Sequence, residues 1–466
     1  MLDGKHSDGL LGGRSKVRDL AREIYGAVEG AAIISPHGHV SARSLAENRP
    51  FNGPSELFIT PDHYVTRLLH SIGIPLEQLG LGDEPGDQRS VWRRLCENWH
   101  VFAGTPTRYW LEDSLSRVFG IAQSPSAHNA DELYDEISSY LGAPEFRPRE
   151  LLARFNVEVL ATTDDPVDGL EHHEHLEQAA DLPTRVIPTL RADAYMAPGT
   201  DTWRERLHAL TDVTGQDCEN YSGLLEAIRM RRAFFKEHGA TATDCGVRDA
   251  WATPLSRRQA EVLHRQGLDG SITPEGVEAY RRNMLFEFGC MAAEDGLVMQ
   301  LHAGILRNHH TPTFERFGPD TGHDLPLVAS YTEPLRELLN AVGTCPTFRI
   351  VLFTVDESTF SRDIAPLAGF YPSVYAGAPW WFLDAPAAAR RYRAAITETA
   401  GFYKTSGFID DTRALCSIPA RHDASRRLDA TYLAELVSEH QLEIDDAHSI
   451  MQALVRDIPH AVFRLS

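Results

Sequence analysis

The strongest constraint on the fold of this chain is the alternation of short apolar runs with longer segments of helical period. The short runs, rich in apolar and β-branched residues, are residues 31–35, 157–163, 184–189, 297–301, 348–355 and 407–409. Segments with the period of an amphipathic helix are residues 274–294, 332–342, 387–403 and 430–440. Strands that alternate with helices indicate parallel βαβ units. Six such runs over 466 residues predict an α/β fold, a (β/α)8 barrel with helical insertions.

Two segments are predicted to be insertions in a single barrel that spans residues 1–466. Residues 84–142 are helical in character and contain Trp92, Trp99 and Trp110, whereas residues 202–238 form a charged helical stretch. We expect these insertions to cover the site or to form a contact between subunits of a homo-oligomer.

Composition limits the partners of this chain. The net charge of −21 argues against nucleic acid, because phosphate binding needs clustered Lys and Arg. No run approaches the ~20 apolar residues that span a bilayer, and the first residues lack the apolar centre of a secretory signal. The six cysteines are scattered without a C-x-x-C pair, which is typical of free thiols in a reducing compartment. We therefore expect a cytoplasmic protein with no nucleic-acid or membrane partner.

Polar and ionisable residues collect where the predicted strands end, and the first such group is a pair of histidines. His37 and His39 follow the first run. On extended backbone, two residues with one residue between them point to the same face. Both imidazoles can reach one cation, of a kind such as Zn, Cu, Fe or Ni. Asp411 ends the last predicted strand, which lies beside the first in a closed barrel, and it can complete the ligand set. His302 ends another strand and is a further candidate ligand.

Each of these residues also has a structural interpretation. An H-x-H pair occurs by chance in a chain with 21 histidines, and Asp411 could cap a helix. A buried, hydrogen-bonded histidine is the commoner fate of a residue such as His302.

Further candidates carry groups that can handle an organic acid. His63 and Tyr64 lie at a predicted helix start after Thr60 and Pro61, where they offer a proton donor or acceptor and a phenol. Arg191 and Arg413 follow strand-like runs, and a guanidinium can bind a carboxylate through two parallel hydrogen bonds. Helix capping and surface salt bridges are the alternative interpretations. The histidine-rich residues 171–175 are predicted to be an exposed helical turn rather than a metal site.

The chain also resembles the uronate isomerases, a branch of the amidohydrolase superfamily, over nearly its whole length. The motifs that carry the resemblance are residues 35–39 with 46–48, 62–64, 155–166, 299–302 with 306–308, 380–382, 411–413 and 421–422. The resemblance implies a distorted (β/α)8 TIM-type barrel of the metal-dependent hydrolase type. It also implies interconversion of D-glucuronate with D-fructuronate, and of D-galacturonate with D-tagaturonate.

The same resemblance implies roles for individual residues. His37, His39 and Asp411 match the positions of metal ligands, with zinc as the expected ion. His63, Tyr64, Arg191 and Arg413 match positions that handle the sugar acid, with His63 and Arg413 expected at its carboxylate. His302 and Trp381 are expected to bind substrate as well.

Aldose–ketose isomerisation removes the proton at C2, passes through an enediol and adds a proton at C1. We expect Asp411 to be both ligand and base, and Tyr64 to donate to or hold the substrate oxygens.

Two positions depart from the family pattern. Ser35 replaces the Asp that is common in the opening motif of the superfamily, and Cys245 stands where the family usually has His. If that position contacts the metal, Cys245 could still bind zinc as a thiolate.

Two other functions remain open at this point. A deaminase-like hydrolase of the same superfamily is suggested by His302, Ala303 and Gly304, but Ile305 replaces the Glu that would shuttle protons. A non-catalytic protein that binds sugar acids is the other alternative.

Overall fold

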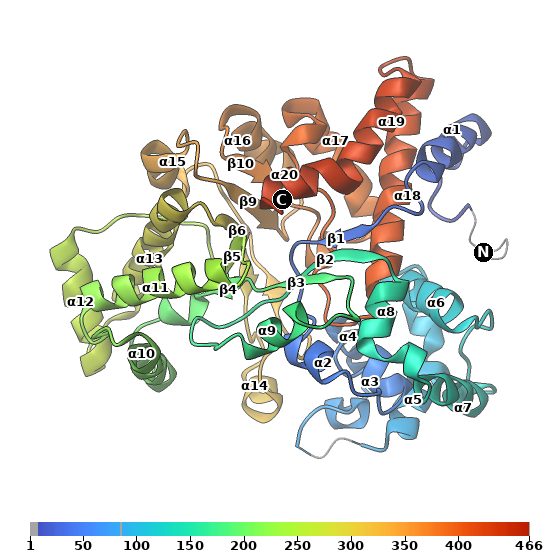
Figure 1. The fold of residues 1–466 in the computed structure, drawn as a ribbon, viewed down its shortest axis with the longest axis horizontal. Coiled ribbons are helices and arrows are strands. Elements are labelled where there is room, and N and C mark those ends of the chain that lie inside the picture. Colours follow the sequence, from blue (N-terminus) through green and yellow to red (C-terminus); the bar gives the residue numbers. More distant parts are fainter. Residues whose placement is uncertain (1–7, 84–85, 466) are drawn as a thin grey trace.

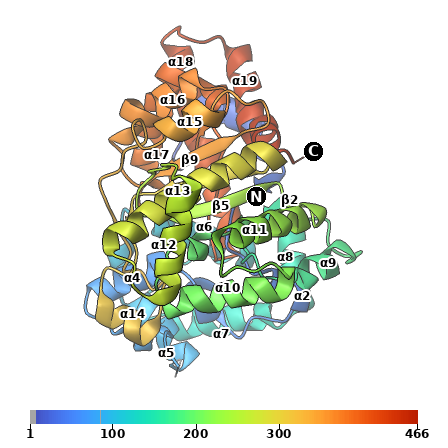
Figure 2. The ribbon, with the colours of Figure 1, turned by 90° about the vertical axis from the view of Figure 1, so that its left-hand side faces the viewer.

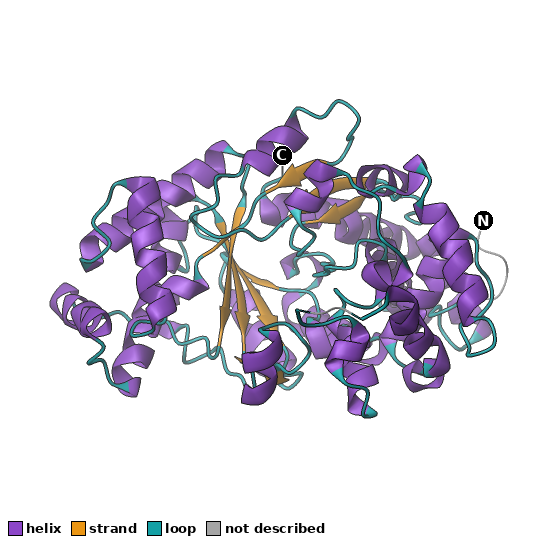
Figure 3. Ribbon diagram, turned by 90° about the horizontal axis from the view of Figure 1, so that it is seen from below, coloured by secondary structure: helices purple, strands orange, loops and turns teal. Residues whose placement is uncertain are grey.

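Parallel strands form the centre of the molecule, and helices surround them (Figure 3). The structure, a computed structural model, describes residues 8–83 and 86–465. Within these residues the strands form sheets of three, five and two strands. The three-stranded sheet has the order β1 (Ile33–Ser35), β2 (Val157–Ala161) and β3 (Arg185–Ile187). The five-stranded sheet has the order β10 (Val374–Ala376), β9 (Ile350–Thr354), β6 (Val298–Ala303), β5 (Ala242–Val247) and β4 (Leu190–Arg191). A small antiparallel pair joins β7 (Ile305–Leu306) and β8 (Leu325–Pro326).

Backbone contacts close the two parallel sheets into a distorted barrel. A parallel bridge between Asp164 and Leu190 joins the segment after β2 to β4, and a second bridge joins Ala376 of β10 to Thr405. The amide of His39 then donates to the carbonyl of Thr412 at 3.0 Å, which ties the last segment to the first strand. The predicted α/β barrel is therefore confirmed.

The interior of the barrel is built from alternate residues of successive strands. Ile34, Val159, Val298 and Val351 belong to one buried apolar cluster although they come from different strands. Side chains alternate along a strand. In β5 and β6, each residue that lies two positions after an inward-pointing residue therefore also points inward. This periodicity places Asp244, and then His302, above the apolar layer.

Some predicted strand boundaries were wrong. Residues 407–409 do not form a strand, because the φ of +73° at Gly407 is far from the extended backbone of a strand. The strand β5 (Ala242–Val247) was missed, since Thr243 and Asp244 interrupt its apolar character.

Helices cover the outside of the strands (Figures 1 and 2). On one side these are α10 (Asp201–Thr214), α11 (Tyr221–Glu237), α12 (Arg257–Asp269), α13 (Pro274–Asp295) and α15 (Arg336–Val342). Further along the chain come α16 (Ala365–Phe370), α17 (Pro386–Ala400), α18 (Ser417–Ser438), α19 (Ile444–Gln452) and α20 (Ile458–Phe463). The N-terminal helix α1 (Ser15–Gly26) packs along α18, so the two ends of the chain stabilise each other.

A second group of helices lies on the side of the molecule next to β1 and β2 (Figure 1). It contains α2 (Ala42–Glu47), α3 (Pro54–Phe58), α4 (His63–Ser71), α5 (Gln88–Glu97), α6 (Pro106–Phe119), α7 (Ala130–Leu141), α8 (Pro148–Arg154) and α9 (Glu171–Glu177). Trp92 and Trp99 are buried in an apolar cluster shared by these helices. We propose that residues 84–142 and 202–238 are insertions in one barrel; residues 84 and 85 lie outside the described residues.

Among the described residues, no helix combines the length and the apolar character needed to cross a membrane.

Candidate active site

A cavity of about 720 Å³ opens at the carboxyl ends of the parallel strands. Its lining comes from loops that follow different strands, as expected for the active-site face of a (β/α)8 barrel. The lining includes His39, His63, Tyr64, Asp164, Arg191, Asp193, Gly246, Arg307, Asn308, Asp320, Trp380, Trp381, Asp411 and Arg413.

At the base of this cavity, residues from the first, middle and last parts of the chain meet. The Nε2 atoms of His37 and His39 lie 3.3 and 2.9 Å from Oδ1 of Asp411. The ring of His302 lies 4.8 Å from the ring of His37, centroid to centroid. His37, His302 and Asp411 each offer one ligand atom, and these atoms lie within 4.8 Å of one another, so the three residues could hold a metal ion.

Asp411 has an unusual backbone conformation, and the groups around it keep its carboxylate ionised. Its φ of +43° is in the left-handed region, which is uncommon for a residue other than glycine and often found at functional sites. Burial opposes ionisation, but the charges and hydrogen bonds of His39 and His37 keep the pKa of Asp411 well below its usual range. The carboxylate is therefore available as a ligand or as a base at neutral pH.

Asp244 orients His302 from below. The Nδ1 atom of His302 lies 2.7 Å from Oδ1 of Asp244, and Nη1 of Arg191 lies 3.1 Å from Oδ2 of the same carboxylate. This contact leaves Nε2 of His302 buried without a hydrogen-bond partner among the described residues. An unpartnered buried imidazole nitrogen beside a carboxylate-held Nδ1 is the usual arrangement of a metal-binding histidine, so this donor set fits a cation.

Cys245 does not take part in this site. It follows Asp244 in β5, and its side chain packs on the outer face of the sheet in the apolar cluster that contains Leu301 and Leu352. Burial raises the pKa of the thiol well above its usual value, so a thiolate is not formed there. The expectation that Cys245 could replace a metal ligand is wrong, because strand alternation points it away from the cavity.

The first turn of α4 brings two further candidates to the wall of the cavity. Asp62 caps this helix through a 2.9 Å hydrogen bond from the amide of Tyr64. The ring of His63 lies 5.1 Å from the ring of Trp381, and its Nε2 atom is buried with no hydrogen-bond partner in the part of the chain that is described. The hydroxyl of Tyr64 donates to Oδ2 of Asp384 at 2.7 Å.

The state of His63 leads to a prediction about stability. Burial and the nearby Arg413 lower its pKa to about 3, whereas an unfolded histidine titrates near ~6.5. Below pH ~6.5 the unfolded chain binds a proton that the folded chain does not. The free energy of unfolding therefore decreases as the pH is lowered. We expect His63→Gln to make this dependence shallower by at most about 1 kcal/mol per pH unit between about pH 6 and pH 4.

Urea denaturation at several pH values measures this slope. The matched control is His70→Gln, because His70 lies in the same helix but is exposed, and its replacement should leave the slope unchanged. An unchanged slope in the His63 variant would contradict a neutral, buried His63.

Four arginines line the cavity, and their partners differ; Arg206 pairs with Asp165. Arg191 is held by Asp193 at 2.8 Å and by Asp244. Arg413 pairs with the partly exposed Asp320 at 3.0 Å. Arg307 lies 5.1 Å above the ring of Trp381, measured from its guanidinium carbon to the ring centroid. The cavity therefore places four guanidinium groups beside the carboxylates of its lining, among them Asp193, Asp320 and Asp411.

Two residues of this site were missed from the sequence. Asp193 and Asp244 hold Arg191, and each follows or belongs to a strand, which was the signal that could have found them. Arg307, which belongs to the motif at residues 306–308, lies on Trp381. Residues 171–175 fall in α9 as predicted, but His173 is buried rather than exposed. Its Nε2 contacts Oγ1 of Thr162 at 2.8 Å, next to the end of β2.

The chain is similar to known proteins in both sequence and structure. The family model described as glucuronate isomerase matches residues 15–463. A uronate isomerase of Corynebacterium efficiens is 46% identical over 462 residues, which cover 99% of this chain and 98% of that protein. The crystal structure of a glucuronate isomerase from Caulobacter crescentus superposes with a TM-score of 0.97 at 39% identity, covering 99% of this chain and 97% of that one. A uronate isomerase structure from Thermotoga maritima gives a TM-score of 0.93 at 30% identity, with 99% and 100% of the two chains covered.

Proposed function

The chain belongs to the glucuronate isomerase family, and we propose that it interconverts D-glucuronate with D-fructuronate and D-galacturonate with D-tagaturonate. The observation that carries this proposal is the ionised Asp411 at the base of a cavity lined by arginines. Such a cavity matches an anionic sugar whose reaction is a proton transfer between neighbouring carbons.

Arg413 is the best candidate to bind the substrate carboxylate. Arg191 is already held by two carboxylates, those of Asp193 and Asp244, whereas Arg413 contacts Asp320, which is 41% exposed. A substrate carboxylate can replace a solvent-exposed partner more readily than a buried one, because less buried charge is left unpaired. His63 lies in the same wall and, being neutral, can donate a further hydrogen bond to the acid group.

Asp411 is proposed to take the proton from C2 and return it at C1. Its Oδ1 faces the two histidines, and Asp411 also lines the large cavity. The carboxylate is thus within reach of a substrate in the cavity. A positioned base of this kind contributes roughly 10²–10⁴-fold to the rate of proton transfer.

His37, His39, His302 and Asp411 are proposed to hold a divalent metal ion, with zinc favoured by the imidazole-rich donor set. When bound, the ion would supply Lewis-acid polarisation of substrate oxygens. Asp244 supports this role by fixing the orientation of His302.

The deaminase-like alternative is not favoured. The position of the missing proton shuttle is taken by Ile305, which is buried in the apolar cluster of the barrel and presents no ionisable group. The relatives compared above are named uronate or glucuronate isomerases.

A coupled assay on D-glucuronate and D-galacturonate tests the activity directly. We expect conversion to the keto acids and a primary kinetic isotope effect with C2-deuterated D-glucuronate, because the C2 bond breaks in the reaction. Release of ammonia from purines or pyrimidines without isomerisation would instead support a hydrolase.

Removal of metal is expected to destabilise the protein. A ligand that binds only the folded state, at 100 times its Kd, stabilises by about 2.7 kcal/mol. We therefore expect a chelator to lower Tm, and readdition of zinc to restore it, with bound metal measured by elemental analysis. An unchanged Tm together with an absence of bound metal would contradict the metal site.

We also propose that the protein is a cytoplasmic homo-oligomer. Its six cysteines are all free, which agrees with a reducing compartment. Light scattering after size-exclusion chromatography measures the oligomeric state, and a monomer would contradict this proposal.

A further inference from the structure

We propose that Asp384 is a positioning residue of this site, which directs the hydroxyl proton of Tyr64 away from the substrate. Tyr64 then presents an acceptor oxygen to the cavity rather than a donor. The inference rests on the proposed isomerase function and adds to it a residue outside the cavity. Of the two roles expected from sequence, that Tyr64 donates to substrate oxygens or holds them, it favours the second.

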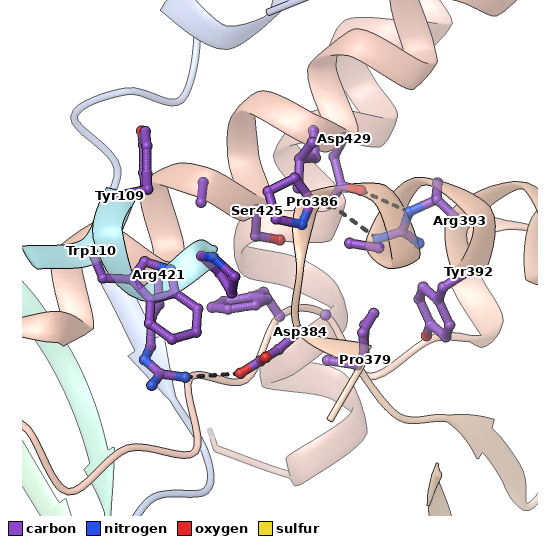
Figure 4. Close-up of a pocket in the computed structure, with 17 residues that line it drawn as sticks. Tyr109, Trp110, Pro379, Asp384, Pro386, Tyr392, Arg393, Arg421, Ser425 and Asp429 are labelled. Carbon is purple, nitrogen blue, oxygen red and sulfur yellow. Dashed lines mark hydrogen bonds and ion pairs between the residues drawn. The ribbon is translucent and has the colours of Figure 1, made fainter. Parts of the chain in front are cut away.

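The contact between Tyr64 and Asp384 crosses the wall between two pockets. Tyr64 lines the large cavity, whereas Asp384 lines a smaller, mostly apolar pocket between α6, α17 and α18 (Figure 4). The phenolic oxygen lies 2.7 Å from Oδ2 of Asp384. Asp384 is not among the residues that line the large cavity, so it acts on the reaction through Tyr64.

Arg421 fixes the carboxylate of Asp384 and favours its ionised form. Its Nη1 lies 3.0 Å from Oδ2 of Asp384 and also donates to the carbonyl of Asp410 at 3.2 Å. The guanidinium carbon lies 3.7 Å from the ring centroid of Trp110 and 4.9 Å from that of Tyr64. One buried arginine therefore links Asp384, Tyr64 and the backbone that precedes Asp411. Figure 4 shows its contact with Asp384.

The local backbone holds Asp384 at this place. Trp381 begins a 3-10 turn, Trp381–Leu383, with a φ of +51°, and the amide of Asp384 donates to its carbonyl at 3.1 Å. The turn thus fixes the relative positions of two residues. Trp381 lines the large cavity, and Asp384 lies on the side of the smaller pocket. Burial raises the pKa of Asp384 to about 6, so the carboxylate is ionised at neutral pH.

The chemical consequence follows from the single proton of a phenol. An ionised carboxylate can only accept, so the Tyr64 proton points to Asp384 and the lone pairs of its oxygen are left for other donors. When C2 of the substrate changes from an alcohol to a carbonyl, its hydroxyl must give up a hydrogen. A Tyr64 oxygen held as an acceptor is suited to bind that hydroxyl.

A double-mutant cycle of Asp384→Asn with Tyr64→Phe tests this inference. The Asn side chain is neutral and can donate as well as accept, so the direction of the Tyr64 proton is no longer imposed. We expect Asp384→Asn to lower kcat/KM for D-glucuronate by roughly 10–100-fold, mostly through kcat. In the Tyr64→Phe background, the same change should alter kcat/KM by less than about twofold, because the phenol through which Asp384 acts is gone.

Asp429→Asn is the matched control. Asp429 pairs with Arg393 at 2.7 and 3.0 Å in the same small pocket, so it is a similar carboxylate–arginine pair without contact to Tyr64 (Figure 4). We expect its replacement to leave kcat/KM within about twofold of wild type in both backgrounds. If the Asn variant at position 384 does not fold, Asp384→Ser, whose neutral hydroxyl can also donate as well as accept, takes its place in the cycle.

The outcomes separate the inference from the proposed function. Equal losses from Asp384→Asn with and without the Tyr64 hydroxyl would show a structural role and overturn the inference. Full activity of Tyr64→Phe would overturn it as well. An absence of uronate isomerisation by the wild-type protein, in contrast, is seen before any variant is made and would refute the function itself.

Discussion

Replacement of Asp411 by Asn is expected to lower kcat/KM for uronates by about 10³-fold, the largest effect on activity that we predict. The amide cannot take a proton from C2, and it is a poorer metal ligand than a carboxylate. The side chain has almost the same shape, so the contacts of Asp411 with His37 and His39 change in charge more than in packing.

The measurement must separate the two proposed roles of Asp411. Metal content is determined for the zinc-loaded variant, and the C2 isotope effect is measured on any residual activity. A variant that keeps its metal but loses turnover supports the role of base. Asp410→Asn is the neighbouring control: Asp410 is buried and contacts His422 at 3.0 Å, and we expect a loss of less than about tenfold. Full activity of Asp411→Asn would contradict both roles.

The largest effect on stability is expected for Asp244→Asn. This carboxylate is fully enclosed between Arg191 and His302, and although burial opposes ionisation, their charges lower its pKa below the usual range. Removal of one partner of a buried charged network leaves the other charges uncompensated, which typically costs roughly 3–5 kcal/mol. We expect the free energy of unfolding to fall by roughly 3 kcal/mol at neutral pH.

The sign of the pH dependence follows from the lowered pKa. A carboxylate with a depressed pKa in the folded state stabilises the fold above its unfolded pKa of ~3.9, and this stabilisation is lost as the pH falls. The variant should therefore show a smaller loss of stability on acidification than the wild type. Urea denaturation measures both quantities, and Asp201→Asn, which removes an 88% exposed partner of Arg204, should change stability little. Wild-type stability of Asp244→Asn would contradict the proposed network.

Local sequence patterns predicted much of the barrel, because the hydrophobic pattern of a strand or helix can be recognised from residues that are close together in the sequence. The runs at 31–35, 157–163 and 348–355 became β1, β2 and β9 because a strand buried on both faces is apolar throughout. The strand β5 was not predicted because it is not apolar throughout. Asp244 lies on its inner face, where the side chain takes part in the site. Strand prediction thus failed at β5, where the barrel carries chemistry, and also at β10, which is only three residues long.

The sequence by itself determined the type of fold, the histidine pair and the ends of strands such as β1 and β9, since each depends on residues close together in the chain. Only the tertiary structure decided which groups are partners. Asp384 meets Tyr64 across 320 positions, and Asp244 meets His302 across 58, because the closing of the barrel brings their strands and loops together. Hydrogen-bond direction depends on these pairings: Asp244 leaves Nε2 of His302 free, and Asp384 turns Tyr64 into an acceptor. No local spacing encodes such contacts, because they form between elements that are distant in the chain and adjacent in the folded barrel.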